Sequence, residues 1–256
     1  MAKQTVGWSG GGSGDDGRMC PHASTETRWE AAARTRWGSY ITKIERRFLL
    51  CALDMANTVG DAMEVGAEGG RWSKMLYRAG WTLTLTDIDP KAIDVCRARL
   101  PRANCILVNS EDESLPIGNT SVDLVICIEV PTVIRQEWFV SEATRVLRPG
   151  GFVVGVFHNR RSFRGFVQHL RSRVKRDVDF YATSYAPWRR RIQARGFCIV
   201  KEEGFCWFPF GRESNAPFID CFTWLERHLG LRKLPTLSPW VALIARKDAV
   251  DRRRGT

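Results

Sequence analysis

Hydrophobic residues along the chain change their spacing from helical to strand-like and back. Between residues 29 and 53, large apolar side chains recur at three- and four-residue steps, which predicts one or two amphipathic helices. Short apolar runs then alternate with helical patterns. The expected strands are 62–65, 82–86, 105–108, 122–128, 152–157, 197–202 and 240–245, and the expected helices are 69–79, 90–100, 136–147 and 187–195. This alternation indicates an α/β fold whose parallel sheet is covered by helices on both faces.

Turn residues mark several of these boundaries. Pro90 is expected in the first turn of its helix, and Gly196 is expected to end the helix before it. The segment from Arg148 to Gly151 reads Arg-Pro-Gly-Gly. It predicts a turn between a helix and the strand that follows.

The two ends of the chain differ in composition from the part between them. Residues 1–25 contain a Gly-Gly-Gly-Ser-Gly run and few large apolar groups, so we expect a disordered leader. Residues 248–256 are expected to form a basic tail. A single domain is predicted over 26–247, with a helical, lid-like insertion at about 159–186 and an aromatic-rich insertion at about 204–238.

The chain shows no sign of a membrane span or an export signal. No apolar run approaches the roughly 20 residues that cross a bilayer. The N-terminus also lacks the apolar segment of a secretory signal. We therefore expect a cytoplasmic protein.

The composition adds a strong positive charge. The formal net charge is +11 and the sequence pI is about 9.6, which implies attraction to anions such as a membrane surface, a phosphorylated molecule or nucleic acid. Eight cysteines are scattered singly without a CxxC pair. Cys20 and His22 stand close together, but two groups in a flexible leader make a poor site. No metal is expected.

The clearest chemical pattern lies where the first predicted strand turns into a helix. The segment from Glu64 to Arg71 reads Glu-Val-Gly-Ala-Glu-Gly-Gly-Arg, and glycines there allow unusual backbone angles and close approach of a ligand. Asp87 follows Gly66 by 21 residues, at the end of the second predicted strand. A carboxylate at this point can accept hydrogen bonds from both hydroxyls of a ribose. The pattern predicts a nucleotide-type cofactor, and spacing alone does not separate NAD from S-adenosylmethionine.

Four further segments follow in order. They are Thr86–Pro90 (Thr-Asp-Ile-Asp-Pro), Glu111–Pro116 (Glu-Asp-Glu-Ser-Leu-Pro), Val122–Cys127 and Arg145–Gly151. Together with the glycine turn they resemble the motifs of class I S-adenosylmethionine-dependent methyltransferases, in particular the small-molecule group that includes the quinone-biosynthesis C-methyltransferases. The resemblance covers roughly residues 35–157. It implies a Rossmann-like, doubly wound sheet of seven strands, mostly parallel with an antiparallel last strand, and S-adenosyl-L-methionine as cofactor.

The resemblance also implies roles for single residues near the first two strands. Glu64 would orient the glycine turn and the methionine ammonium of the cofactor, while Gly66 and Ala67 would lie against its methionyl part. Asp87 would hold the ribose, and Ile88 would pack on the adenine face. These five positions form the core of the expected cofactor site.

One position departs from the family motif. The motif has a glycine where this chain has Glu68. We expect the loop to shift by one residue and to use Gly69, followed by Gly70, in its place. The alternative is that Glu68 impairs cofactor binding.

Further candidates lie at the ends of later strands. The resemblance implies that Glu111 or Asp112 accepts a hydrogen bond from the adenine amino group, and that Glu129 sits near the cationic sulfonium and the substrate. His158 immediately follows the fifth predicted strand, and the near-neutral pKa of a histidine suits a general base for a hydroxyl acceptor. We expect Glu129 and His158 to act in catalysis; His158 is otherwise a polar loop residue.

A basic segment follows His158. Residues 160–176 contain seven basic residues and no acidic one, and their apolar residues share one helical face: Phe163, Phe166, Val167, Leu170 and Val174. This pattern predicts a basic amphipathic helix. It would either contact an anionic membrane, which implies a peripheral position at the inner membrane face, or dock its apolar face on the core.

Three functions are compatible with these patterns. The first is a methyltransferase acting on a small-molecule or lipid-like acceptor. The second is an RNA or protein methyltransferase, but the segment Ile128–Pro131 lacks the Asn/Asp-Pro-Pro-aromatic clamp of adenine-amino and glutamine methylation, and no recognised RNA-binding module is present, so nucleic acid is not the expected partner. The third is a non-catalytic binding protein. The sequence does not identify the acceptor, its accepting atom or the oligomeric state.

Overall fold

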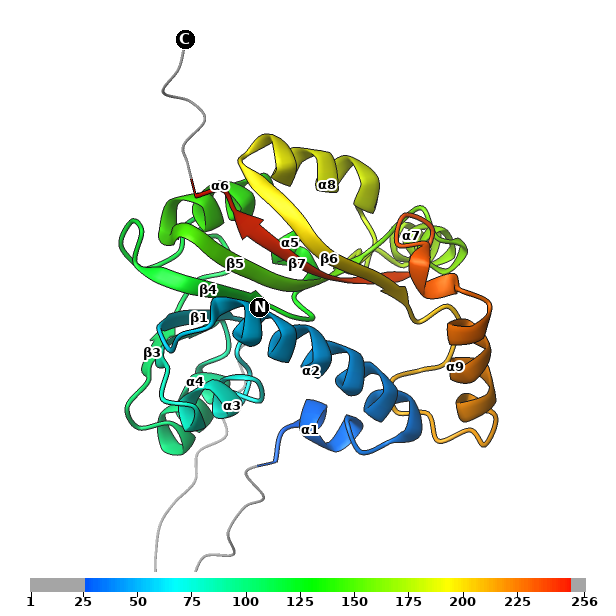
Figure 1. Ribbon diagram of the computed structural model, residues 1–256. Coiled ribbons are helices and arrows are strands. Elements are labelled where there is room, and N and C mark those ends of the chain that lie inside the picture. The colour runs from blue at the N-terminus through cyan, green and yellow to red at the C-terminus, as the bar shows by residue number, and fades with distance from the viewer. Residues whose placement is uncertain (1–25, 250–256) are drawn as a thin grey trace, which may run out of the picture.

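A seven-stranded sheet with the order β3-β2-β1-β4-β5-β7-β6 runs through the structure, a computed structural model that describes residues 26–249 (Figure 1). The strands are β1 Asp61–Val65, β2 Thr82–Asp87, β3 Asn104–Leu107, β4 Val122–Cys127, β5 Leu147–His158, β6 Phe197–Phe205 and β7 Trp240–Lys247. β7 runs antiparallel to β5 and β6, and the other neighbouring pairs are parallel. The prediction of a mostly parallel, Rossmann-like sheet with an antiparallel last strand is confirmed.

Helices cover both faces of this sheet. They are α1 Arg28–Ala32, α2 Arg36–Ala56, α3 Ser73–Arg78, α4 Pro90–Arg99, α5 Pro131–Ile134, α6 Glu137–Val146, α7 Phe163–Lys175, α8 Tyr185–Ala194 and α9 Ile219–His228, with the 3-10 helix η1 at Leu231–Lys233. Figure 1 shows α2, α3 and α4 on one face and α5, α6 and α8 on the other. No helix among the described residues is both long enough and apolar enough to traverse a bilayer.

Each face of the sheet packs its own core. On one side, α2 contributes Trp37, Ile41 and Phe48 to a cluster that continues into β1, β2 and β4. On the other side, Trp188 and Tyr185 of α8 pack with residues of α6 and β5. The indole of Trp188 also donates a hydrogen bond of 2.8 Å to the backbone carbonyl of Ile134. Buried apolar surface on both faces explains why the strands read as nearly continuous hydrophobic runs.

The structure corrects three sequence-based boundaries. The predicted helix at 69–79 is shorter, because α3 begins only at Ser73. The predicted turn from Arg148 to Gly151 lies within the bounds of β5, as an irregular stretch: the pairing with β4 passes from Leu147 to Phe152, and Gly150 has φ 84°. Part of the aromatic-rich insertion is helical, as α9 and η1. The expected leader, the Cys20 and His22 pair and the last seven residues of the basic tail lie outside the described residues.

The sheet order places the expected ligand crevice between the two central strands β1 and β4. Connections from β1 lead outward to β2 and β3 on one side, while β4 and β5 lie on the other. Beyond the carboxyl ends of such strands a crevice opens where ligands bind in open α/β sheets. At the carboxyl ends of these strands, the glycine turn follows β1, Ile88 follows β2, Glu129 lies just after β4, and His158 is the last residue of β5.

Candidate functional site

The glycine turn after β1 has three residues in the left-handed backbone region. They are Gly66 with φ 69°, Glu68 with φ 51° and Gly70 with φ 68°. Glu68 therefore adopts the conformation that a glycine would take at this position, and Gly69 does not replace it. The expected shift of the loop is wrong. A non-glycine residue in this region costs roughly 1–2 kcal/mol, so the surrounding contacts must hold Glu68 in place.

Asp87 is the main partner of this strained loop. Its Oδ2 accepts a hydrogen bond of 2.7 Å from the backbone N–H of Glu68, and its Oδ1 accepts one of 3.0 Å from the N–H of Asp89. Gly66 packs closely as well, because a Cβ on it would lie 2.5 Å from a methyl group of Val130. The predicted glycine loop and acid are thus brought together, with the loop fixed by the same carboxylate that is expected to bind ribose.

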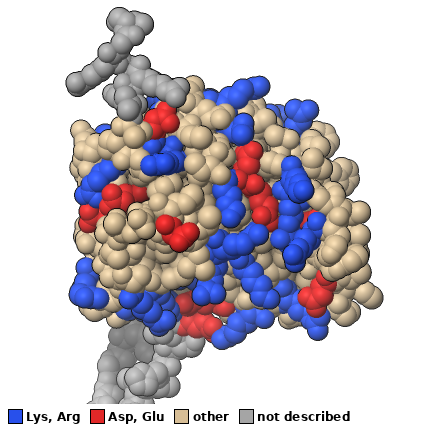
Figure 2. Space-filling model, in the orientation of Figure 1, with Lys and Arg blue, Asp and Glu red and all other residues tan. Residues whose placement is uncertain are grey.

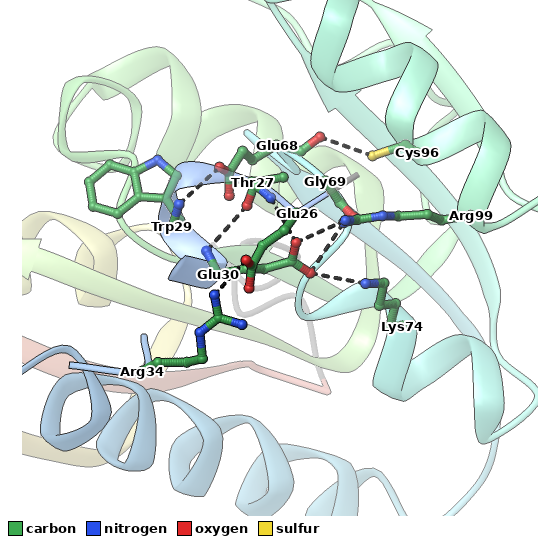
Figure 3. A network of polar contacts seen from close by, with 10 residues as sticks. All are labelled: Glu26, Thr27, Trp29, Glu30, Arg34, Glu68, Gly69, Lys74, Cys96 and Arg99. Atoms are coloured by element: carbon green, nitrogen blue, oxygen red, sulfur yellow. Dashed lines mark hydrogen bonds and ion pairs between the residues drawn. The ribbon is translucent and has the colours of Figure 1, made fainter. Parts of the chain in front are cut away.

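The side chain of Glu68 points toward α1. Its Oε1 accepts a hydrogen bond of 3.4 Å from the backbone N–H of Trp29, as Figure 3 shows. Burial raises the pKa of Glu68, although hydrogen bonds from Thr27 and Trp29 oppose that shift. Glu68 therefore joins the N-terminal helix to the glycine loop.

Glu30 makes the strongest contacts of α1 (Figure 3). It closes a capping box with Thr27 and forms ion pairs with Lys74 at 2.9 Å and Arg99 at 2.8 Å. Burial alone would raise the pKa of Glu30, but the hydrogen bonds from Thr27, Arg99 and Lys74 prevail and lower it to about 2. α1 is held across the loop by a carboxylate that stays ionised throughout the neutral range.

Glu64 lies beneath the loop, at the end of β1. Its Oε2 accepts a 3.0 Å hydrogen bond from the backbone N–H of Ser73 and contacts the Ser73 hydroxyl. Burial raises the pKa of Glu64 to about 7. A cationic group nearby would favour its ionised form, which fits the expected role beside an ammonium.

The expected adenine contacts lie on the outer side of Asp87. The Ile88 side chain is 61% exposed, although apolar side chains of this size are usually buried. Glu111 and Asp112 are exposed in the loop after β3, where Asp112 accepts a 2.9 Å hydrogen bond from the N–H of Asn109. The exposure of Ile88, Glu111 and Asp112 leaves all three side chains accessible to a ligand, and their roles toward adenine stay predictions.

Glu129, just after β4, belongs to a cluster of buried charges. It has φ 61°, contacts the guanidinium of Arg212, and lies 3.8 Å from that of Arg71. Arg71 also forms a 3.1 Å ion pair with the fully buried Glu45. Burial lowers the pKa of Arg212 to about 10. The sequence pattern did not identify Arg71, Arg212 or Glu45, because nothing in their local sequence shows that they meet.

Two cavities meet at this cluster. A small pocket of about 50 Å³ is lined by the glycine turn, Glu64, Arg71 and Ile128. A larger cavity of about 710 Å³ is lined by α7, by the segment that follows it, and by His158. Trp29 and Glu129 line both. The arrangement therefore places a loop site and a roomier, partly aromatic site on the two sides of one carboxylate.

His158, the last residue of β5, lies in the wall of the larger cavity. Its ring stacks between Trp240, at 4.3 Å between centroids, and Tyr181, at 5.2 Å. Burial lowers the pKa of His158 to about 3, and the nearby Arg164 and Arg135 add to the shift. The expectation of a near-neutral pKa is wrong, because the sequence does not reveal this desolvation. Neither ring nitrogen has a hydrogen-bond partner among the described residues.

Comparison with known proteins gives matches over the same region. A family model described as a methyltransferase domain matches residues 63–155. A protein of Mycobacterium bovis described as an uncharacterized methyltransferase is 31% identical over 117 residues, which are 46% of this chain and 47% of that protein. The demethylmenaquinone methyltransferase of Tropheryma whipplei is 29% identical over 129 residues, 49% of this chain and 53% of that enzyme. The chain thus spans about half the length of these relatives.

The fold resembles solved structures over a longer stretch. The geranyl diphosphate C-methyltransferase of Streptomyces coelicolor, solved with Mg²⁺, geranyl diphosphate and S-adenosyl-L-homocysteine, superposes with a TM-score of 0.56. The alignment covers 84% of this chain and 82% of that one, at 14% sequence identity. At this identity the likeness concerns the fold.

Proposed function

We propose that the chain, whose residues 63–155 match the model of a methyltransferase domain, is a class I S-adenosylmethionine-dependent methyltransferase that transfers a methyl group to a small-molecule or lipid-like acceptor. The observation that supports this most directly is the contact between the two cavities. The glycine-turn pocket and the larger cavity share Trp29 and Glu129. A methyl donor in the first would face an acceptor in the second.

The residues around the loop fit the cofactor of this superfamily. Gly66 leaves room for close approach of a ligand, and Glu64 lies buried below the loop. The carboxylate of Asp87 accepts a hydrogen bond from the loop, from the N–H of Glu68. Ile88 is exposed beside Asp87. The small pocket measures about 50 Å³, well below the roughly 300 Å³ or more of typical ligand sites, because α1 lies over it. Binding would therefore require α1 to move.

S-adenosylmethionine would supply a methyl group already activated by a sulfonium, so the protein contributes mainly position and exclusion of water. In our proposal Asp87 accepts hydrogen bonds from the ribose hydroxyls, and Glu111 or Asp112 accepts one from the adenine amino group. Glu64 and Glu129 provide negative charge for the ammonium and sulfonium groups of the cofactor. The aromatic walls of the larger cavity hold the acceptor.

His158 is our candidate for the general base. His158 lines the larger cavity, and neither of its ring nitrogens has a hydrogen-bond partner among the described residues. Its pKa of about 3 keeps the imidazole unprotonated at neutral pH but makes it a weak base. An anion bound near Arg164 and Arg135 would offset the two cations that lower this pKa, and would make His158 a stronger base.

The lipid-like nature of the acceptor draws on the relatives. One relative is described as acting on demethylmenaquinone, and the structural neighbour was solved with geranyl diphosphate. Both names denote molecules with a long apolar part. A cavity of about 710 Å³ with aromatic walls lies within the range of small-molecule sites.

Calorimetric titration with S-adenosylhomocysteine tests the proposal. We expect saturable heat with one ligand per chain and no heat with NAD, which would need a similar glycine turn. The reaction product is preferred as the probe because it does not turn over. Absence of heat at high micromolar ligand would leave only a non-catalytic scaffold.

We also propose that α7 contacts an anionic membrane. Contrary to the usual arrangement, its apolar residues face solvent: Phe163 is 87% exposed and Val174 is 85% exposed, and Phe166 and Leu170 are exposed as well. Elsewhere, basic side chains along α2 and toward α9 are interspersed with acidic ones (Figure 2), for example in the ion pair of Arg47 with Glu203. Residues 160–176 contain no acid.

Removal of two outward charges should weaken this contact. Each arginine near an anionic surface is worth about 1 kcal/mol, so Arg173→Gln with Arg176→Gln should reduce binding to phosphatidylglycerol-containing vesicles about thirtyfold. Phe163→Ser with Val174→Ser should also release the protein, whereas the exposed Val59→Ser, placed before β1, should not. Co-sedimentation provides the measurement. Equal binding of all variants, or equal binding to pure phosphatidylcholine, would contradict the proposal.

A further inference from the structure

The inner face of α7 carries a basic stripe. Arg164, Gln168, Arg171 and Lys175 follow one another at four-, three- and four-residue steps, so they share one side of the helix. All four line the larger cavity. Arg164 is half-buried, while Arg171 and Lys175 are exposed toward its mouth. The helix thus presents cations to the cavity and apolar side chains to solvent.

Two of these cations have no partner of opposite charge. Within residues 26–249, the side chains of Arg171 and Lys175 form no hydrogen bond or ion pair. Arg164 donates only two long hydrogen bonds, of 3.4 Å each, to the backbone carbonyls of Phe208 and Phe210. The stripe therefore has positive charge and donor groups available for a ligand.

Most of the acidic groups in the cavity wall are already engaged. Asp179 lies 2.5 Å from the Nδ1 of His169 and accepts a 2.9 Å hydrogen bond from the N–H of Tyr181. Glu129 lies between Arg212 and Arg71. Asp177, which is exposed at the rim, is the remaining acid of the wall. The basic stripe is thus not neutralised from across the cavity.

The wall beyond the stripe is aromatic. It includes Tyr181, Trp240 and Phe180, with His158 stacked between the first two. Near Glu129, the guanidinium of Arg212 is buried and paired with that carboxylate. Cationic donors along one side of an aromatic cavity favour a flat or apolar molecule that carries a negative charge.

We infer that the methyl acceptor carries an anionic group, a carboxylate, sulfonate or phosphate, that binds to the basic stripe of α7. This inference rests on the proposed function, since it takes the larger cavity as the acceptor site. Charge-assisted hydrogen bonds from guanidinium and ammonium groups are stronger than neutral ones. The apolar body of the acceptor would then lie along Tyr181 and Trp240, with its reacting atom toward Glu129.

A pair of matched probes tests the inference. 2-Naphthoate and 2-naphthamide share an aromatic body and differ in charge, and Trp29 and Trp240 in the cavity wall make tryptophan fluorescence a suitable readout. With saturating S-adenosylhomocysteine, we expect naphthoate to bind at least tenfold more tightly than naphthamide. In Arg171→Gln with Lys175→Gln, this preference should fall to about twofold while naphthamide binding stays unchanged. Equal affinity for the two probes in the native protein would overturn the inference.

The control is Arg173→Gln, on the same helix but outside the cavity wall, which should retain the full preference for naphthoate. Survival of the preference in the double variant would also refute the inference, since the charge would then be recognised elsewhere. The heat of S-adenosylhomocysteine binding is measured separately. Loss of that heat alone would count against methyl transfer and would leave the anion site standing.

Discussion

Replacing Asp87 by alanine is expected to weaken the binding of S-adenosylhomocysteine at least tenfold. In our proposal the carboxylate accepts hydrogen bonds from the ribose, and a hydrogen bond to a charged group contributes about 1.5–3 kcal/mol. The same carboxylate accepts hydrogen bonds from the backbone N–H groups of Glu68 and Asp89. The substitution thus removes a ligand contact and loosens the loop together. Isothermal calorimetry measures the first effect.

A second variant separates the two effects. Asp87→Asn keeps one oxygen that can still accept from the N–H of Glu68, but it loses the charge and one acceptor. We expect its melting temperature to stay closer to that of the native protein than that of Asp87→Ala, while its affinity for the ligand still falls. Unchanged affinity in both variants would mean that Asp87 only supports the loop.

Mild acid is expected to destabilise the protein through His158. Its pKa is lowered from the ordinary 6.5 to about 3 in the folded state, chiefly by burial. The unfolded chain therefore binds a proton that the folded chain does not, and this contribution to stability is complete above about pH 6.5 and lost progressively as the pH falls toward 3. Between pH 7 and pH 5 the loss amounts to about 2 kcal/mol.

Urea unfolding of the native protein and of His158→Phe at the two pH values isolates this contribution. Phenylalanine keeps a flat ring between Trp240 and Tyr181 but cannot take up a proton, so the variant should lose about 2 kcal/mol less than the native protein on acidification. His228→Gln, whose ring stacks on the exposed Trp224, serves as a matched substitution. An identical pH dependence in the native protein and His158→Phe would show that His158 titrates normally and is not desolvated.

The sheet was predictable because its strands bury both faces. Apolar runs at 62–65, 82–86 and 122–128 correspond closely to β1, β2 and β4. The aromatic residues around α9 did not reveal their helix, because their spacing is irregular and several remain exposed. The segment predicted as a turn at 148–151 lies within the bounds of β5, but its residues have no partner in β4, because the pairing passes from Leu147 directly to Phe152.

The cofactor side of the site follows from the sequence better than the acceptor side. Gly66, Gly70 and Asp87 are local motifs, and the structure brings them together. Arg71, Arg212 and Trp29 meet only through tertiary packing, so no spacing rule finds them. Equally, the pattern at 160–176 predicted the amphipathic helix but not which of its faces points outward.

The contacts of α1 bear on how quickly ligands exchange. A helix of five residues has almost no stability of its own, so its place over the glycine turn depends on Glu30, on Glu68 and on the stacking of Trp29 with Arg212. Local melting of residues 28–32, rather than hinge motion of whole domains, would admit fresh cofactor and release spent product. The rate of the catalytic cycle would then be set by the local unfolding and refolding of residues 28–32, while the sheet and the other helices keep their positions.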